Sequence, residues 1–311
     1  MKLKNLEYFI VIAEQKSLHK AAEVLFNSQP NLTRAMHSLE DEVGAELLIR
    51  SNQGVELTPI GESLYYYAKS ILNQLDAVSG LKMLSQETVQ SKLNVAVARI
   101  IFADDLMLRF YETVKSNHTT INLFETTVED VINSVATLQS EIGIVAINTF
   151  QFPIFRRSLE IKEIEYEVLD RGPIYIQVSE ASTLLKQEKI YAKDLLDYSY
   201  IHLPYDYYAN INFGLDIGGI RFSDFKKTIT MNNYHAIIRM LKHADAFIFG
   251  NKWQMEELAK GRIVSREIEN ITSDIMLIWI KRKKEVISGN GRKFLDLFRE
   301  YYANKPDTRD T

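Results

Sequence analysis

The spacing of apolar residues predicts three short helices near the N-terminus. Apolar positions recur every three or four residues from Leu6 to Ala13, from Leu18 to Leu25 and from Leu32 to Val43, as on one face of an amphipathic helix. Ser17 stands where the second helix needs an N-cap, and Gly44 stands just past the end of the third. Any three-helix core has spacing of this kind, so the pattern alone assigns no function.

A short polar break before the third helix makes the segment from Leu18 to His37 a predicted helix-turn-helix. Pro30 suits the first turn of the third helix, whose polar residues fall opposite its apolar stripe. Arginine can hydrogen-bond guanine, glutamine and asparagine can hydrogen-bond adenine, and proline or threonine can pack on the thymine methyl group. The third helix is therefore the expected DNA reader, and its predicted DNA-binding residues are Ser28, Gln29, Pro30, Asn31, Thr33, Arg34 and His37.

A small β-hairpin, or wing, is expected next. The runs 47–50 and 55–58 read as two short strands, with a turn at Gln53-Gly54 between them. Arg50 at the base of this hairpin and Gln53 in its turn are added to the predicted DNA-binding residues.

A long helix is expected from Pro59 to about Ser79. Its apolar residues alternate steps of four and three, as in the seam of a coiled coil. One interpretation is a linker helix that joins two copies of the chain, and the other is a helix packed on its own domain. We predict dimerisation, and the seam residues are Leu64, Ala68, Ile71, Leu75 and Val78.

After a polar hinge at 85–91, short strand-like runs alternate with helical patterns to the end of the chain. Strands are expected at 93–98, 121–124, 142–147, 166–169, 174–178, 198–202, 229–231, 246–249 and 275–280. Helices are expected at 106–114, 128–138, 192–196, 234–242 and 291–302. This alternation predicts an α/β domain with a mainly parallel sheet and helices on both faces.

Composition narrows the class of protein. The chain has 311 residues, enough for about two domains, and no cysteine, which excludes disulfides and suits a reducing, cytoplasmic location. We expect no export signal, because Glu7 and Glu14 interrupt the apolar residues that follow the start. No segment approaches the roughly 20 apolar residues that span a bilayer, so no membrane partner is expected. The net charge is −4, and residues 1–60 hold six basic and eight acidic residues, so a basic patch alone cannot support DNA binding.

Residues 1–60 resemble the DNA-binding domain of the LysR family of transcriptional regulators almost throughout. Two positions depart from the family pattern, since Thr33 stands where serine is usual and Leu48 where phenylalanine is commoner. The matching pieces are Leu6-x-x-Phe9, Ala13-Glu14-x-x-Ser17-Leu18, Ala21-Ala22-x-x-Leu25, Ser28-Gln29-Pro30, Leu39-Glu40, Gly44-x-x-Leu47-Leu48-x-Arg50 and Leu57-Thr58-x-x-Gly61.

The rest of the chain resembles the LysR effector domain more loosely. Glu141-Ile142-Gly143-Ile144, Asp197–Ile201 and Phe294-x-Asp296-x-x-Arg299 look like family segments, whereas Ala98, His118-Thr119 and Ala244–Phe247 depart from the pattern. The resemblance implies an α+β multi-domain chain: a winged helix-turn-helix at 1–58, a linker helix and hinge at 59–90, and a periplasmic-binding-protein-like effector domain at 91–303. Its two subdomains are expected at about 91–162 with 268–303, and at about 163–267.

A small-molecule effector is expected in the cleft between the subdomains, beyond the carboxyl ends of the strands. Arg99 is either an anion clamp or a surface arginine lying over Ile100 and Ile101, and His202 is either a packing residue or a ligand contact. The predicted effector-binding residues are Arg99, Ile100, Ile101, Phe102, Thr126, Thr127, Asn148 and His202.

The predicted function is therefore a sequence-specific, effector-modulated transcriptional regulator. The resemblance implies double-stranded DNA with an inverted repeat, a second copy of the chain (as dimer or tetramer) and RNA polymerase as partners. The alternative is a regulator that works through oligomerisation or a protein partner, with a degenerate effector pocket. An enzyme is not expected, because no nucleophile elbow, phosphate-binding loop or metal motif is present, and neither a cofactor nor a metal is predicted.

Overall fold

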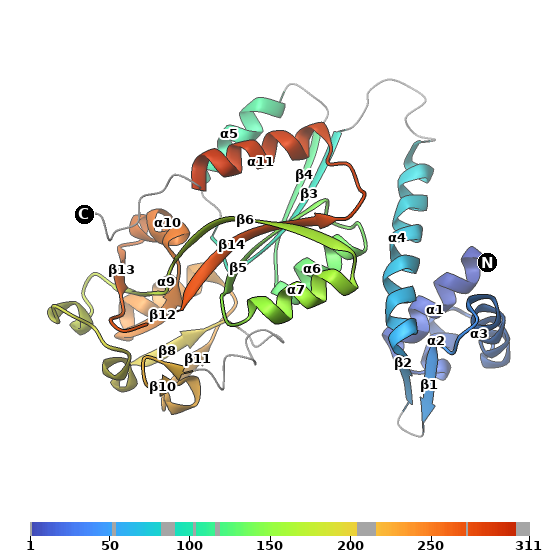
Figure 1. Cartoon of the computed structure of the whole chain (residues 1–311), viewed down its shortest axis with the longest axis horizontal. Coiled ribbons are helices and arrows are strands. Elements are labelled where there is room, and N and C mark those ends of the chain that lie inside the picture. The colour runs from blue at the N-terminus through green and yellow to red at the C-terminus, as the bar shows by residue number, and fades with distance from the viewer. Residues whose placement is uncertain are drawn as a thin grey trace.

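The computed structural model describes residues 2–51, 54–81, 91–101, 104–115, 119–203, 216–271 and 273–302. The elements form a small helical domain with a two-stranded hairpin, a long helix beside it, and a larger C-terminal domain built on two sheets (Figure 1). This organisation is the predicted one of a winged helix-turn-helix, a linker helix and a two-part α/β domain.

The N-terminal domain has three helices and a wing. They are α1 (Leu3–Gln15), α2 (Leu18–Val24), α3 (Gln29–Val43), β1 (Leu48–Ser51) and β2 (Gly54–Leu57), with the two strands antiparallel. The predicted start of α2 and end of α3 are both confirmed. Ser17 accepts a hydrogen bond from the backbone N–H of Lys20, and Gly44 ends α3 in the left-handed region at φ 77°.

Helix α4 (Pro59–Leu81) packs first against its own N-terminal domain. Ala68 is fully buried in that domain's core, and Leu64 and Ile71 pack against the same core. Leu75 is 36% exposed, and the side chain of Val78 lies outside the described residues. Three of the five predicted seam residues therefore already have a partner within the chain.

Helix α4 also touches the C-terminal domain. The Tyr66 ring packs against that domain's core, with the ammonium of Lys162 3.4 Å from the ring centroid. About two turns further on, the amide of Asn73 donates a hydrogen bond to the backbone carbonyl of Thr137. The linker helix is thus fixed to both domains of one chain.

The first subdomain is a five-stranded sheet between two helical layers. The strand order is β4 (Thr119–Glu125), β3 (Ser91–Ala98), β5 (Ile142–Asn148), β14 (Asp274–Arg282) and β6 (Ile164–Pro173). Strands β4, β3 and β5 run parallel, and β14 pairs antiparallel with both β5 and β6.

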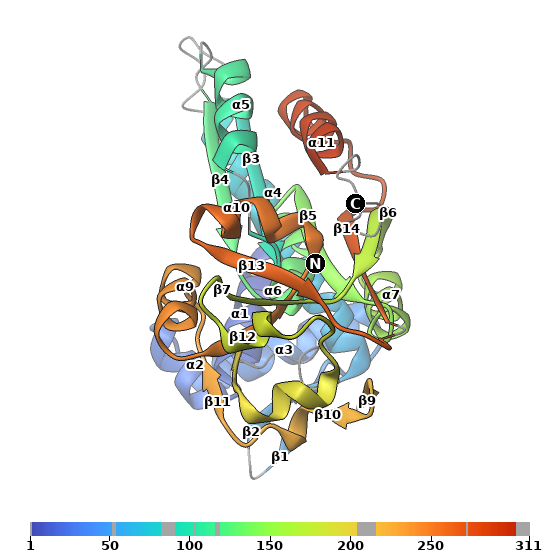
Figure 2. The same ribbon diagram turned by 90° about the vertical axis from the view of Figure 1, so that its left-hand side faces the viewer.

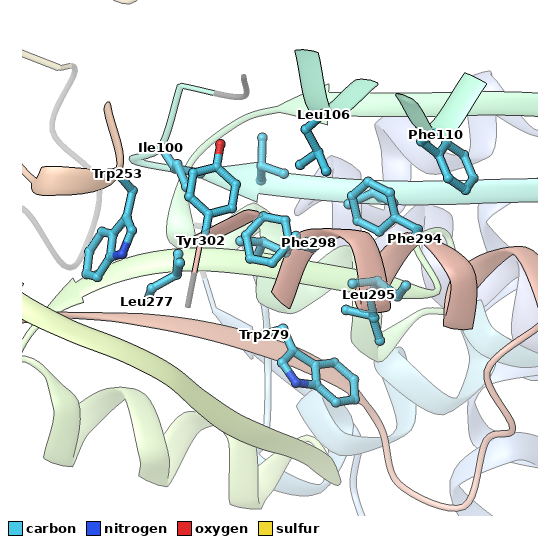
Figure 3. Packing of buried hydrophobic residues seen from close by; sticks show 14 of the residues in the cluster. Ile100, Leu106, Phe110, Trp253, Leu277, Trp279, Phe294, Leu295, Phe298 and Tyr302 are labelled. Atoms are coloured by element: carbon cyan, nitrogen blue, oxygen red, sulfur yellow. The ribbon is translucent and has the colours of Figure 1, made fainter. Parts of the chain in front are cut away.

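Four helices cover this sheet. They are α5 (Asp104–Val114) and α11 (Gly289–Tyr302) on one face, and α6 (Val128–Ala136) and α7 (Phe152–Ile161) on the other (Figure 1). Figure 3 shows the first face, where the rings of Phe294, Phe298 and Tyr302 from α11 line up against the sheet. Trp253 and Trp279 lie at two places in the same core.

The second subdomain is a smaller sheet with the order β11 (Thr228–Thr230), β8 (Ser199–His202), β12 (Ala246–Gly250), β7 (Tyr175–Ser179) and β13 (Ile263–Glu267). Figure 2 labels β11, β12, β7 and β13 of this sheet. The strands β11, β8 and β12 are parallel, and β7 is antiparallel to β12 and β13.

Helices and short turns cover the two faces of this second sheet. One face carries α9 (Tyr234–His243) and α10 (Met255–Lys260). The other carries an aromatic cluster around Tyr200 and the short 3₁₀ helices η1 (Thr183–Lys186), η2 (Ala192–Asp197) and η4 (Phe222–Asp224). The hairpin of β9 (Asp216–Ile217) and β10 (Ile220–Arg221) packs on the same face through Ile220. The short helix η5 (Lys252–Gln254) follows β12.

The structure differs from the sequence prediction at the first crossover. Strand β6 pairs with β14 in the first sheet, so the chain passes to the second subdomain after Pro173 and not near residue 162. An edge strand in which only Ile164 and Gly172 are buried has too few buried apolar positions to indicate which sheet it joins. The sheets are also mixed and not mainly parallel, and α7, α10 and β13 were not predicted.

Candidate functional site

The reading helix α3 separates its residues into two faces as predicted. Leu32, Met36 and Leu39 are fully buried in the N-terminal core. Thr33 is half-buried, and Arg50 is exposed on β1, whereas Gln53 lies outside the described residues. The other predicted contacts are all exposed, namely Ser28, Gln29, Pro30, Asn31, Arg34 and His37.

One acidic residue near the end of α3, Glu40, binds the backbone at the start of the wing. The Glu40 carboxylate accepts hydrogen bonds from the backbone N–H groups of Leu47 and Leu48, at 2.9 and 3.3 Å. Its other oxygen lies 3.6 Å from Nδ1 of His37. This acid is therefore turned toward the protein, which removes one negative charge from the solvent face of the reading helix.

The second candidate site lies where the two subdomains meet. Arg99 follows β3 with a left-handed backbone (φ 60°), and its Nη1 donates to Oε1 of Gln151 at 3.1 Å. Its carbonyl accepts from Nδ2 of Asn251 at 3.0 Å, and Asn251 directly follows β12 of the second sheet. Arg99 is half-buried and joins the two subdomains, so it does not simply lie over the surface of Ile100 and Ile101.

Three of the other predicted effector residues make contacts near this junction. Gln151 also accepts from the backbone N–H of Asn148, which places Asn148 beside Arg99. Ile100 is fully buried in the first core, and Ile101 packs against the core of the second subdomain. Phe102 lies outside the described residues.

The remaining predicted effector residues have structural roles of their own. Thr127 caps α6, and its hydroxyl and that of Thr126 both donate to the carboxylate of Asp130. His202 is only 5% exposed, and its ring nitrogens lie 3.1 Å from Oγ1 of Thr230 and 2.8 Å from a backbone carbonyl. The packing interpretation of His202 matches these contacts.

A set of buried amides also lies at this junction, beyond the residues that the sequence predicts. Gln177 donates to Gln254 at 3.3 Å, and Gln254 donates to the hydroxyl of Tyr234 at 2.9 Å. Asn251 is 3% exposed, and its Oδ1 has no hydrogen-bond partner among the residues that the structure describes. The rule that singled out Arg99, a polar residue just beyond a strand, would also have found Asn251.

Burial and nearby charges shift the pKa of the Tyr234 hydroxyl at this junction. Burial raises the pKa of the Tyr234 hydroxyl, nearby Glu125 raises it further, and Arg99 opposes both. Burial also raises the pKa of the Glu125 carboxyl group. Glu125, Arg99 and the amide of Gln254 therefore all act on the Tyr234 hydroxyl at this junction.

A buried ion pair lies close to this junction. Oδ2 of Asp170, on β6, accepts from the ammonium of Lys252 and from the indole N–H of Trp253, each at 2.9 Å. The side chains of Lys252 and Asp170 are 8% and 19% exposed. This contact ties the first subdomain to the segment that follows β12.

The described residues contain no helix long and apolar enough to cross a membrane, and no group of three or more histidine or acidic side chains that could hold a metal ion.

Comparison with known proteins decides the family. Residues 3–62 match the model described as "Bacterial regulatory helix-turn-helix protein, lysR family", and residues 102–303 match the "LysR substrate binding domain". The chain belongs to the LysR family. These matches confirm the predicted family and its two parts, a regulatory helix-turn-helix followed by a substrate-binding domain, and the curated relatives are named as regulators.

Curated LysR-family relatives match over part of their length. The nitrogen assimilation regulatory protein nac of Klebsiella aerogenes is 33% identical over 116 residues, which are 37% of this chain and 38% of that protein. The regulator BenM of Acinetobacter baylyi is 41% identical over 76 residues, which are 24% and 25% of the two chains. The chain thus aligns with less than half of either relative.

A structural neighbour covers the whole chain. The crystal structure of full-length BenM superposes with a TM-score of 0.50 at 18% identity, over 99% of both chains. At that identity the likeness supports the LysR fold and nothing about ligands.

Proposed function

We propose that α3 of this LysR-family regulator enters the major groove of DNA and reads sequence with its outer face. The observation that carries the proposal is the exposed row of Gln29, Asn31, Arg34 and His37 opposite a fully buried apolar stripe. Figure 1 shows α3 at the edge of the molecule, on the side of the N-terminal domain away from the effector domain. Arg50 on the wing supplies a phosphate contact.

Binding to DNA is tested with the full chain and duplexes from the region flanking its gene. Mobility shift should show a complex, and Arg34→Ala should weaken it by about 10-fold or more, since a bidentate arginine–guanine contact is worth about 1–3 kcal/mol. Lys193→Ala, an exposed residue of the second subdomain, is the matched control. If the wild-type chain binds no flanking or selected duplex, the proposal is wrong.

We also propose that the subdomain junction binds a small anionic effector with a hydrogen-bond donor. The guanidinium of Arg99 would take the anion. The buried Oδ1 of Asn251, which has no hydrogen-bond partner among the described residues, would accept from a hydroxyl or amine of the ligand or from a bridging water. On the side of the first sheet, Gln151, which is bonded to Arg99 and to the backbone of Asn148, would lie beside the anion.

A thermal-shift screen of carboxylates, phosphates and neutral metabolites tests this assignment. A true effector raises the melting temperature, because it binds the folded chain only. Arg99→Ala should abolish the shift with anions, and Asn251→Ala should weaken only ligands that carry a donor. Neutral hits that keep their full shift in Arg99→Ala would reject the clamp.

We propose that two copies of the chain join through α4. The dimer binds an inverted repeat in double-stranded DNA. It acts in the cytoplasm and contacts RNA polymerase. Leu64, Ala68 and Ile71 already pack within the chain, so among the described side chains of the stripe the exposed Leu75 is the member left for a partner copy. Analytical ultracentrifugation should show a dimer or tetramer, and Leu75→Glu should lower the mass. A monomeric wild type would overturn this part.

A further inference from the structure

A line of side-chain hydrogen bonds runs from α1 to the reading face of α3. Nδ2 of Asn27 donates to the hydroxyl of Tyr8 at 2.8 Å, and Oδ1 of Asn27 accepts from Nδ2 of Asn31 at 3.1 Å. Oδ1 of Asn31 then accepts from Nη2 of Arg34 at 3.0 Å. We call these four residues the Tyr8–Arg34 relay.

The direction of each bond in the relay is fixed by groups that can only donate. The backbone N–H of Ser28 donates to Oδ1 of Asn27 at 2.8 Å, so the amide oxygen of Asn27 must face α3 and its NH₂ must face Tyr8. At the other end, the guanidinium of Arg34 has no acceptor, so it must meet the oxygen of Asn31. The relay therefore has one consistent arrangement of donors and acceptors.

The inner end of the relay is anchored in the fold. Tyr8 is half-buried and packs against the N-terminal core, and Asn27 is half-buried in the turn between α2 and α3. The backbone N–H of Asn27 also donates to the carbonyl of Ala22 at 2.9 Å, and the preceding Phe26 lies in the left-handed region at φ 46°. This turn directs the Asn27 side chain back toward α1.

The outer end of the relay is exposed. Arg34 and Asn31 both lie on the solvent face of α3. A free arginine side chain samples many rotamers and loses that freedom when it binds, whereas one already held in place loses less. Both polar atoms of the Asn31 amide take part in the relay, which suits Asn31 to holding Arg34 more than to reading a base itself.

We propose that Asn27 is a positioning residue that sets base preference: it holds Asn31, and through it the Arg34 guanidinium, so that a guanine is selected at one position of the half-site. The inference rests on the proposed reading of DNA by α3. The simpler alternative is that Asn27 only caps the start of α3 through Ser28, in which case its loss lowers stability without changing which base is preferred.

The experiment is selection from a random-sequence DNA duplex pool by the full chain, with the base preference measured at every position. Arg34→Ala identifies the position that this arginine reads. Asn27→Ala should lose preference at the same position by about fivefold, while affinity for unselected duplex stays within about twofold. The double variant Asn27→Ala/Arg34→Ala should match Arg34→Ala alone, because the two residues act through one contact.

Two conservative variants separate positioning from folding. Asn27→Asp keeps the oxygen that faces Ser28 and Asn31, so it should keep the base preference while the added negative charge lowers affinity for all duplexes. Tyr8→Phe removes one hydroxyl from the relay and should lose part of the preference at the same position. Thermal unfolding of each variant reports the stability of the domain independently.

The outcomes are distinct. If the wild type selects no sequence, the proposed DNA reading fails and the inference fails with it. If the wild type selects a site but Asn27→Ala and Tyr8→Phe keep its full preference, only the inference is overturned. A uniform loss of affinity for every duplex with unchanged preference would equally reject the positioning role and favour the capping role.

Discussion

The buried ion pair between Asp170 and Lys252 offers a sharp test of how the effector domain is held together. Asp170→Asn keeps an oxygen that accepts from the indole N–H of Trp253 but removes the negative charge 2.9 Å from the Lys252 ammonium. The Lys252 side chain is 8% exposed, so the change leaves a cation with little access to water. Breaking a buried pair in this way typically costs about 3–5 kcal/mol.

We expect the lower end of that range, about 3 kcal/mol, because the Asp170 side chain is 19% exposed and lets some water reach the site. With a denaturant slope of about 2 kcal/mol/M, the urea midpoint should fall by about 1.5 M. Fluorescence is a selective probe, since the chain has 2 tryptophans, Trp253 and Trp279, and both lie in the core of the first subdomain (Figure 3).

Two further variants complete the test. Asp170→Asn combined with Lys252→Met removes both charges and should return to within about 1 kcal/mol of the wild type. The control is Glu269→Gln, which breaks the exposed pair with Lys189 and should cost less than about 1 kcal/mol. An Asp170→Asn chain as stable as this control would refute the reasoning.

Two other predictions concern the N-terminal domain and the linker contact. Glu40→Ala removes the carboxylate that holds the backbone N–H groups of Leu47 and Leu48, so hydrogen exchange at these amides should speed up by about 10-fold or more, and unchanged exchange would contradict this role. Burial lowers the pKa of Lys162 to about 8, more than its acidic neighbours restore, so from pH 8 to about 10.4 the unfolded chain holds a proton that the folded chain has released. The wild type should therefore gain stability relative to Lys162→Met as pH rises through that window in urea titrations, whereas Lys193→Met, on an exposed lysine, should run parallel to the wild type.

Local signals in the sequence were enough for the N-terminal domain. The Ser17 cap, Pro30 in the first turn of α3 and Gly44 beyond its end each act over a few residues, and the structure has all three as predicted. The inner and outer faces of α3 follow from helical periodicity alone. The prediction did not foresee that Glu40 bonds the wing, because that contact depends on how the hairpin folds back.

Long-range pairing limited the prediction of the effector domain. Helix α7 was missed because only Phe155 and Leu159 are buried in it, too few for a clear periodic stripe. Strand β6 was placed with the wrong sheet because its neighbour β14 is more than a hundred residues away along the chain. Gln151 and Asn251 reach the junction from loops after strands of different sheets, so no local pattern connects them.

The position of β14 has a consequence for the order in which the protein can fold. This strand lies between β5 and β6, although it is made after the whole second subdomain. During synthesis the N-terminal domain and then the second subdomain can close while the first sheet still lacks its fourth strand, with the edges of β5 and β6 uncovered. Of the two subdomains, the one that begins first along the chain is therefore completed last, and its assembly waits for contacts of long sequence separation.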